Sequence, residues 1–512
     1  MSAAREAESL RIVVIGGHLS KTRWLVNQNQ RKRGLPAWEL ISSSKRVNLV
    51  KQLAQYQDGR LELQDVPVPV PPPGGLLVRT THSVISIGTE KMKVEQARMN
   101  LLQKARARPD QVRKVLDTAR TLGWRSAVEK VRNRLETPTP LGYSVAGVVE
   151  AVHPDQTRFR VGDRVACGGA ECAFHAEYVA VPDLLAVRVP EGVAGWQAAY
   201  TTIASIALQA VRQAEPAAGD RVLVMGQGLI GLLVTNVLAI SGVRVMAVDL
   251  QESRRSVCSV LGAERVVIPG AQSLVDEVRA WTDGHGVDGV VLCTSGSNNA
   301  PLEQAAAALR DRGRIVVVGN TRADLDWKVF FEKEIEVRYS RSYGPGRYDP
   351  AYEWGGVDYP IGYVRWTEAR NLEACLHWMR TGQLRVDAIT TRRAAFEQAL
   401  EVYRQVMGEG SKEIGVVLEY SGRTANEAVA TVAATLSVGG GEGSATALVE
   451  PRVNRLAVPV KRLDVVGAGN FARTMLLPHL QGKVEFGTVV NQTSLSANHV
   501  KAKFGFARAG TD

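Results

Sequence analysis

The sequence has little cysteine and no long apolar run. Its 512 residues include five cysteines, which are too few and odd in number for a disulfide framework. Most of them lie in apolar segments, which is typical of a reducing compartment, so we expect a cytoplasmic protein. No run of about 18 apolar residues occurs, so no membrane span is expected. The N-terminus has acids near its start and only a short apolar core, unlike a secretory signal.

The positive charge of the chain is concentrated in two segments. The net charge is +11, but residues 1–50 carry nine Lys and Arg against three acids, and residues 91–136 carry thirteen against five. The rest of the chain therefore has a small negative balance. Neither basic segment interleaves aromatic residues with Arg as single-strand nucleic-acid binders do. We expect no nucleic-acid partner.

The stretch from Val222 to Asp249 carries the clearest functional motif. An apolar run leads into Gly226-Gln227-Gly228-Leu229-Ile230-Gly231, and a helical pattern and a second apolar run follow. This order predicts a dinucleotide site. Gly226 would permit the tight turn, Gly228 the approach of a pyrophosphate, and Gly231 close packing of helix on strand. The first helical turn, with Leu229 and Ile230, would present its amides to the phosphates.

Asp249, at the end of the second apolar run, predicts NAD as the cofactor. Its carboxylate would accept hydrogen bonds from the ribose hydroxyls and repel a 2′-phosphate. NADP remains the alternative, because Arg254 and Arg255 could approach such a phosphate. Gly319, at the end of the predicted strand 314–319, is expected at the same cofactor-binding edge.

The chain length predicts two to four domains. Residues 50–195 have β character around a basic helical insertion at 91–136, and residues 196–340 alternate strands with helices, which indicates a parallel sheet. Residues 341–420 are expected to return to the first domain, and residues 421–461 are rich in Ala, Thr, Gly and Ser like a linker. Residues 1–49 stay unassigned, although 11–17 could form a strand and turn.

Residues 462–512 contain a second glycine motif. A predicted strand at 463–466 is followed by Gly467-Ala468-Gly469-Asn470, a helix through 480, a strand at 484–490 and a helix at 494–504. Two strands and two helices bury too little surface to fold alone. The segment should be mobile, docked on the body or completed by another chain, and the linker before it favours mobility.

These features resemble the medium-chain dehydrogenase/reductase superfamily. The landmarks are SIGTE, LGYSVAGVV, VGDRVAC, AEYVAVP, the glycine motif and LGAERVV, between about Val50 and Tyr420. The segment from Ser340 to Asn371 is similar to bacterial oxidoreductases in which such a unit is fused to a domain of the glucose–fructose oxidoreductase/inositol dehydrogenase (Gfo/Idh/MocA) type, and VVGAGNFARTMLLP matches the start of that domain. The resemblance implies an α/β fold with a β-rich GroES-like catalytic domain, a doubly wound Rossmann domain and a truncated second Rossmann half-domain.

The metal positions of the superfamily carry unsuitable residues here. Members that use zinc bind it with a Cys in a CGTD-like turn and a His-Glu pair in a GHE-like turn, where this chain has Ile87 and Tyr143-Ser144. Ile has no lone pair, and a Tyr-Ser pair is a poor zinc site. The four-cysteine zinc lobe is also missing, and Cys167, Cys172 and His175 lack a fourth ligand. The resemblance therefore implies the zinc-independent branch, with no metal.

The former metal positions supply the candidate catalytic residues. Tyr143 could donate a proton or a hydrogen bond, and Ser144, Thr89 and Glu90 could orient substrate hydroxyls. The competing interpretation, which we favour for Tyr143, is that it fills the space left by the metal. The basic insertion either holds an anionic substrate or is a solvated or dimer-forming hairpin. A further group either binds a sugar or packs the interdomain corner: Tyr343, Arg347, Tyr348, Tyr359, Arg365 and Trp366.

Together the sequence predicts an NAD(H)-dependent, zinc-independent oxidoreductase. Its expected substrate is a small molecule, a carbohydrate or nucleotide-sugar-like alcohol or carbonyl, because relatives of the fused domain oxidise sugars and cyclitols. In the relatives of the fused domain, the catalytic Lys lies in an E-K-P motif. No such motif occurs between Leu463 and Asp512, so the resemblance implies that the fused domain itself is inactive. An NADPH-dependent quinone or enone reductase and a non-catalytic, dinucleotide-sensing scaffold are the alternatives. A homo-oligomer is compatible with the sequence.

Overall fold

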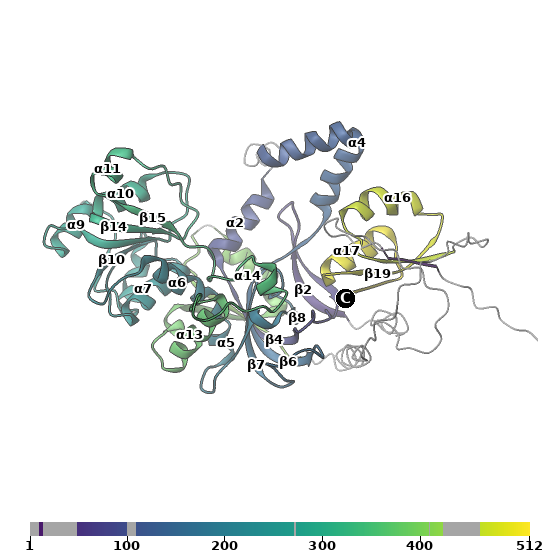
Figure 1. Cartoon of the computed structure of the whole chain (residues 1–512), viewed down its shortest axis with the longest axis horizontal. Helices are drawn as coiled ribbons and strands as arrows, with labels where there is room; N and C mark the ends of the chain where they lie inside the picture. The colour runs from purple at the N-terminus through teal and green to yellow at the C-terminus, as the bar shows by residue number, and fades with distance from the viewer. Residues whose placement is uncertain are drawn as a thin grey trace, which may run out of the picture.

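The computed structural model describes residues 10–13, 49–99, 109–270, 273–408, 410–422 and 461–511. Their strands form four sheets. Figure 1 shows a parallel sheet with its helices on the left, antiparallel sheets in the centre and a C-terminal lobe on the right. The predicted α/β class is confirmed. Among the described residues no helix combines the length and hydrophobicity that a membrane span requires.

Two largely antiparallel sheets form the central body. The larger has the order β16-β17-β4-β6-β7-β9, and β8 also pairs with β4. Its strands are β4 (Leu76–Ile85), β6 (Ser144–Val152), β7 (Arg164–Gly168), β8 (Tyr178–Val181), β9 (Ala186–Arg188), β16 (Thr390–Ala395) and β17 (Gly415–Glu419). The smaller sheet contains β3 (Leu61–Pro67), β2 (Leu49–Gln55) and β5 (Thr139–Pro140). Because β17 pairs with β4, the chain returns to this body after the parallel sheet.

The parallel sheet has the order β12-β11-β10-β13-β14-β15. Alternation along β10 (Arg221–Met225) sends Val222 and Val224 into one core cluster and Leu223 and Met225 into another, so both faces are buried. The other strands are β11 (Arg244–Val248), β12 (Arg265–Val267), β13 (Val287–Leu292), β14 (Leu309–Val317) and β15 (Glu336–Tyr339). The helices of this region are α6 (Thr201–Ala214), α7 (Leu229–Ile240), α8 (Arg255–Val260), α9 (Leu274–Trp281), α10 (Ala300–Ala308) and α11 (Trp327–Glu332). The short α5 (Gly195–Ala198) comes before them and packs on β4 and β6 of the central body.

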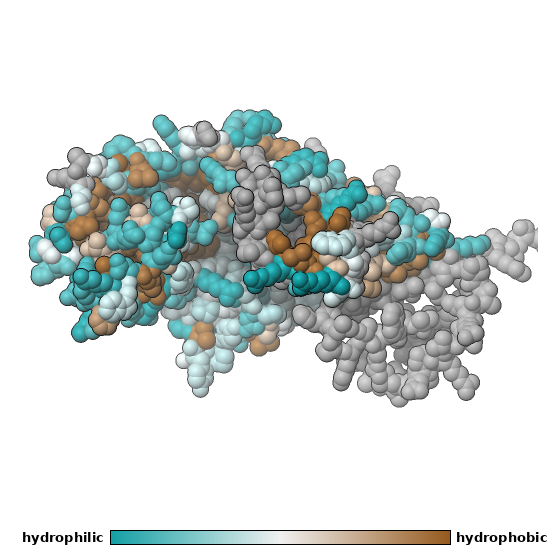
Figure 2. Space-filling view, turned by 90° about the horizontal axis from the view of Figure 1, so that it is seen from above, coloured by the Kyte–Doolittle hydropathy of each residue, from teal (hydrophilic) through white to brown (hydrophobic). Residues whose placement is uncertain are grey.

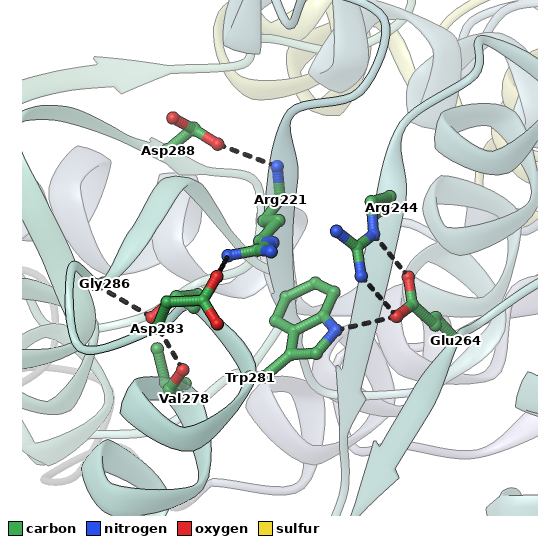
Figure 3. A network of polar contacts seen from close by, with 9 residues as sticks. Arg221, Arg244, Glu264, Val278, Trp281, Asp283, Gly286 and Asp288 are labelled. Atoms are coloured by element: carbon green, nitrogen blue, oxygen red, sulfur yellow. Dashed lines mark hydrogen bonds and ion pairs between the residues drawn. The ribbon is translucent and has the colours of Figure 1, made fainter.

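A polar network closes the amino-terminal edge of this sheet (Figure 3). The Trp281 ring lies between the guanidinium groups of Arg221 and Arg244, at 6.0 and 5.7 Å. Arg244 donates twice to Glu264, at 2.8 and 2.7 Å, and the Trp281 indole donates to the same carboxylate at 3.0 Å. Arg221 pairs with Asp283 at 3.0 Å. Each arginine of this cluster therefore has a carboxylate partner.

The basic insertion forms α2 (Ile87–Arg98) and α4 (Pro109–Glu136), and α4 bends at Gly123, where φ is +83°. In Figure 1, α2 rises beside the parallel sheet and α4 runs across the top toward the C-terminal lobe. Apolar side chains on α4 are exposed, among them Val112, Leu116, Trp124 and Val128. Figure 2, viewed from above, shows hydrophobic surface in the middle of the molecule where α4 lies. These exposed side chains disfavour a purely solvated hairpin.

The C-terminal lobe corrects the expectation of only two strands. Its sheet has the order β1-β18-β19-β20, with β18 (Arg462–Val466), β19 (Glu485–Asn491), β20 (Arg508–Thr511) and, from the other end of the chain, β1 (Leu10–Val13). All three pairings are parallel. The helix α17 (Ser494–Phe504) matches its predicted range, and a π-helical turn at Ala472–Leu476 leads into α16 (Leu477–Leu480). A strand from the unassigned N-terminal extension thus completes this sheet.

The lobe is docked on the central body, which corrects the favoured expectation of mobility. Leu495 of α17 is buried in a cluster with Val50 and Val66 of the small antiparallel sheet. Lys503 forms an ion pair with Glu136 at the end of α4, at 2.5 Å. The Thr511 hydroxyl accepts a hydrogen bond from the Val70 amide at 2.9 Å. Most of the predicted linker, residues 423–460, lies outside the described residues.

The segment before α13 (Glu368–Arg380) includes the short α12 (Pro350–Glu353) and packs the corner beside the body. Arg347 pairs with Glu171 at 2.8 Å and with Glu353 at 2.5 Å. Tyr343 is 2% exposed. Burial raises the pKa of Glu368 to about 9, and the charge of Glu353 adds to the effect. For these residues the corner-packing interpretation fits the structure better than sugar binding.

The last helix of the body is α14 (Ala399–Val406).

Candidate active site

The glycine motif forms the tight turn between β10 and α7. Gly226 has φ +91°, and its amide donates to the Val248 carbonyl at 2.8 Å. A Cβ at Gly231 would collide with the Gly226 carbonyl oxygen, so only glycine lets α7 approach β10 this closely. Gly228 differs, because a Cβ there meets no atom within 4 Å. The open side of Gly228 lies at the N-terminus of α7, where the amides of Leu229 and Ile230 have no helical partner.

Asp249 lies beside this loop. Its carboxylate accepts hydrogen bonds from the backbone amide of Gln227 at 2.6 Å and from the backbone amide of Gln251 at 2.8 Å. A carboxylate has about four acceptor sites, so capacity remains for two hydroxyl donors. Arg254 is buried and donates to the Lys412 carbonyl at 3.2 Å, while Arg255 donates to Glu252 at 2.6 Å and to the Val266 carbonyl at 3.0 Å. Arg255 is thus engaged elsewhere, whereas Arg254 is held by a backbone carbonyl and still lies close enough to Asp249 to interact with its charge.

Gly319 follows β14 at the same carboxyl edge of the sheet. A Cβ at this position would collide with the Thr294 carbonyl oxygen, so the glycine allows the ends of β13 and β14 to approach. The next residue, Asn320, reaches the insertion: its amide lies 3.6 Å from the Met92 sulfur of α2. This contact places the middle of α2 beside the carboxyl edge, where doubly wound folds bind their ligands.

Three of the four predicted catalytic residues lie together at the start of α2. The Ser86 and Thr89 hydroxyls lie close enough to the Tyr143 hydroxyl to act on its pKa, which they lower against the larger effect of burial. The Ser86 hydroxyl donates to Thr89 at 3.3 Å, and the Ser86 amide donates to the Glu90 carboxylate at 3.0 Å. Thr89 is half-buried, whereas Tyr143 and Glu90 are buried. Burial raises the pKa of Tyr143 to about 12. Thr89 is therefore the most exposed of these three side chains.

Glu90 belongs to a buried polar network that sequence reasoning missed. The His175 ring lies 3.5 Å from the Glu90 carboxylate and 2.7 Å from the Ser83 hydroxyl, and the Tyr403 hydroxyl donates to the same carboxylate. Burial alone would raise the pKa of Glu90, but the charge of His175 and these hydrogen bonds hold it below the ordinary value. The sequence drew attention to His175 only as a metal ligand, and Tyr403 carried no signal.

Ser144 is separate from this cluster. Its hydroxyl is buried and donates to the Ala199 carbonyl at 2.6 Å, at the end of α5. Successive residues of an extended chain point to opposite faces, which explains why the Tyr143 and Ser144 side chains lie on opposite sides. The Ser144 hydroxyl is therefore occupied by a backbone carbonyl, and the prediction that it orients substrate hydroxyls does not fit the structure.

The residues at the former zinc positions do not fit the metal. Ile87 offers no donor atom, the Tyr143 phenol holds its proton firmly, and the Ser144 hydroxyl is bonded to a backbone carbonyl. Within the described ranges no three His, Cys, Asp or Glu side chains are arranged to hold a metal ion.

Comparison with known proteins identifies the family. Two family models match, the alcohol dehydrogenase GroES-like domain over residues 118–213 and the zinc-binding dehydrogenase domain over residues 230–355. A 2-dehydro-3-deoxy-L-galactonate 5-dehydrogenase from Pseudoalteromonas atlantica is 30% identical over 43% of this chain and 72% of the relative. The chain belongs to the medium-chain dehydrogenase/reductase family. A sorbitol dehydrogenase from Bacillus subtilis is 25% identical over 41% of this chain and 69% of the relative.

Solved structures agree with the fold of this family. The match to an Escherichia coli oxidoreductase of unknown specificity covers 73% of this chain and 99% of the other, with a TM-score of 0.57 and 15% identity. An alcohol dehydrogenase from Thermus sp. ATN1 covers 72% of this chain and 99% of its own, with a TM-score of 0.55 and 19% identity. The protein is thus an NAD(P)-dependent medium-chain dehydrogenase/reductase with GroES-like and Rossmann-type parts.

Proposed function

We propose that this protein is an NAD(H)-dependent, zinc-independent oxidoreductase of a carbohydrate-like alcohol or carbonyl. The observation that carries the cofactor choice is the Asp249 carboxylate beside the glycine loop, with Arg255 paired to Glu252 and the buried Arg254 hydrogen-bonded to the Lys412 carbonyl. A carboxylate accepts from ribose hydroxyls and repels a 2′-phosphate. The arrangement disfavours an NADPH-dependent quinone or enone reductase.

The cofactor proposal predicts that NADH binds more tightly than NADPH. Asp249→Ser removes the repulsive charge, so the preference should shrink by about tenfold or reverse, the size expected for one charged interaction. Titration of nicotinamide fluorescence on both proteins measures the two affinities. A parent protein that prefers NADPH would refute the assignment.

The metal proposal predicts no stoichiometric zinc. The Ile87, Tyr143 and Ser144 positions supply no thiolate, imidazole or carboxylate, so purified protein should contain well under one zinc per chain. Turnover should be unchanged after incubation with a chelator. Elemental analysis that finds about one zinc per chain, lost together with activity on chelation, would overturn the proposal.

In this proposal the polar side chains at the start of α2 orient the substrate oxygen, a role that zinc has in the zinc-using members of the superfamily. Thr89 contacts the substrate, and Tyr143 lies behind it, next to Ser86 and Thr89. Thr89→Val should therefore lower kcat/KM by about tenfold or more, whereas Tyr143→Phe should change it only severalfold. Steady-state kinetics with the reactive substrate provide the measurement. A larger loss in Tyr143→Phe would instead make Tyr143 the proton donor.

The substrate class is proposed from the relatives. Sorbitol dehydrogenase and 2-dehydro-3-deoxy-L-galactonate 5-dehydrogenase are named for sugar-like alcohols and ketones. Resemblance of the lobe to the Gfo/Idh/MocA type points to the same chemistry, and we propose that this lobe is a fused, non-catalytic half-domain. Screening polyols with NAD and the matching ketoses with NADH tests the class. Tight NADH binding without turnover in such a screen would favour the dinucleotide-sensing scaffold.

A further inference from the structure

A groove of about 750 Å³ lies between α6 and α13, far from the glycine loop. It is lined by Leu208 and Arg212 of α6, by Ser241 at the end of α7 and by Trp366 and Trp378. The glycine loop is at the other end of α7, whose 12 residues span about 18 Å. The volume is typical of small-molecule sites. The groove is therefore separate from the dinucleotide site.

Two guanidinium groups lie against one aromatic ring in this groove. The central guanidinium carbon of Arg212 is 3.5 Å from the Trp366 ring centre, and that of Arg365 is 3.9 Å from it. Arg212 donates to the Asn371 side-chain oxygen at 2.9 Å. Across the described ranges neither arginine has a carboxylate within ion-pair distance, although Glu373 also lines the groove. Burial lowers the pKa of Arg212 to about 10, and the charge of Arg365 contributes to this.

The cluster around Trp281 shows how this chain balances a similar arrangement (Figure 3). There, too, two arginines flank a tryptophan, but Glu264 and Asp283 neutralise both of them. Glu215, which lines the groove, is already paired with Arg314 and Arg338, at 3.2 and 2.8 Å. The charges of Arg212 and Arg365 are thus left for a ligand.

We propose that this groove binds a small aromatic anion, whose carboxylate or phosphate is held by Arg212 and Arg365. Guanidinium groups match the planar oxygen pairs of such anions and bind them with two parallel hydrogen bonds. Leu208 and Trp378 give the groove an apolar wall suited to a ring. The site is independent of the proposed dehydrogenase reaction.

The test uses phenyl phosphate, with benzoate, inorganic phosphate and phenol as comparison probes. Isothermal titration calorimetry on the full chain should show saturable binding of phenyl phosphate and benzoate, and weaker binding of both inorganic phosphate and phenol. Arg365→Gln should weaken phenyl phosphate binding about tenfold. Arg365 is exposed and forms no ion pair with the described residues, so this variant should fold normally.

Arg60→Gln is the matched control, because Arg60 is an exposed arginine 4.2 Å from the Tyr56 ring and is unrelated to the groove. It should bind phenyl phosphate like the parent, and both variants should bind NADH unchanged, which separates this proposal from the dehydrogenase assignment. Absence of saturable binding by phenyl phosphate and benzoate would overturn the site. So would equal affinities in the parent and Arg365→Gln. Equal binding of phenyl phosphate and inorganic phosphate would refute the aromatic part.

Discussion

Gly228→Ala is expected to fold like the parent protein and to lose most of its affinity for NADH. The backbone at Gly228 has φ −74°, which alanine adopts without strain, and the added Cβ would meet no protein atom within 4 Å. That empty space is where a pyrophosphate approaches the backbone in this motif. A methyl group there would displace the phosphates from the N-terminal amides of α7, so we expect a loss of about tenfold to a hundredfold in affinity.

Gly469→Ala is the matched control for this prediction. Gly469 occupies the corresponding position of the second glycine motif, and a Cβ there would lie 3.8 Å from the Gly467 carbonyl oxygen, an ordinary contact. NADH affinity and melting temperature should match the parent, because the proposed cofactor site lies at Gly228. Fluorescence titration and thermal denaturation measure the two quantities. Unchanged NADH affinity in Gly228→Ala, or a loss in Gly469→Ala, would contradict the placement of the cofactor.

Sequence reasoning succeeded where the determining interactions are local. The turn at Gly226 and the helix that follows depend on a few neighbouring residues, and the apolar runs mark the strands on either side. Helix α17 has its predicted bounds, and local features account for both ends: Thr493 caps its first turn and Gly505 ends it with φ +79°. Such signals are readable without knowledge of distant contacts.

Sequence reasoning failed where the partners are distant along the chain. Glu90 and His175 are 85 positions apart, so only the folded body shows that the carboxylate is already satisfied. Ser144 could be placed next to Tyr143, but the carbonyl that binds its hydroxyl comes from residue 199. The pairing of β1 with β18 joins the two ends of the chain, and no local pattern predicts such a partner.

The same pairing changes what a cut in the linker should do. The sequence alone suggests that proteolysis between 421 and 461 releases the terminal segment from an active body. In the structure β1 remains attached to the body side of such a cut, and it pairs with β18 along four residues. Leu495 is also buried against Val50 and Val66. We therefore expect the C-terminal fragment to stay bound after cleavage and to co-elute with the body in size-exclusion chromatography.

Leu495→Asp should abolish this retention. The substitution puts an unpaired carboxylate into an apolar cluster where Leu495 is 2% exposed, at a cost on the order of several kcal/mol. Most of the docking energy of α17 would be lost, so the nicked fragment should dissociate. Lys483→Asp, an exposed substitution in the same lobe, should leave the fragment bound. Release of the fragment from the nicked parent protein would show that β1 and α17 do not hold the lobe on the body.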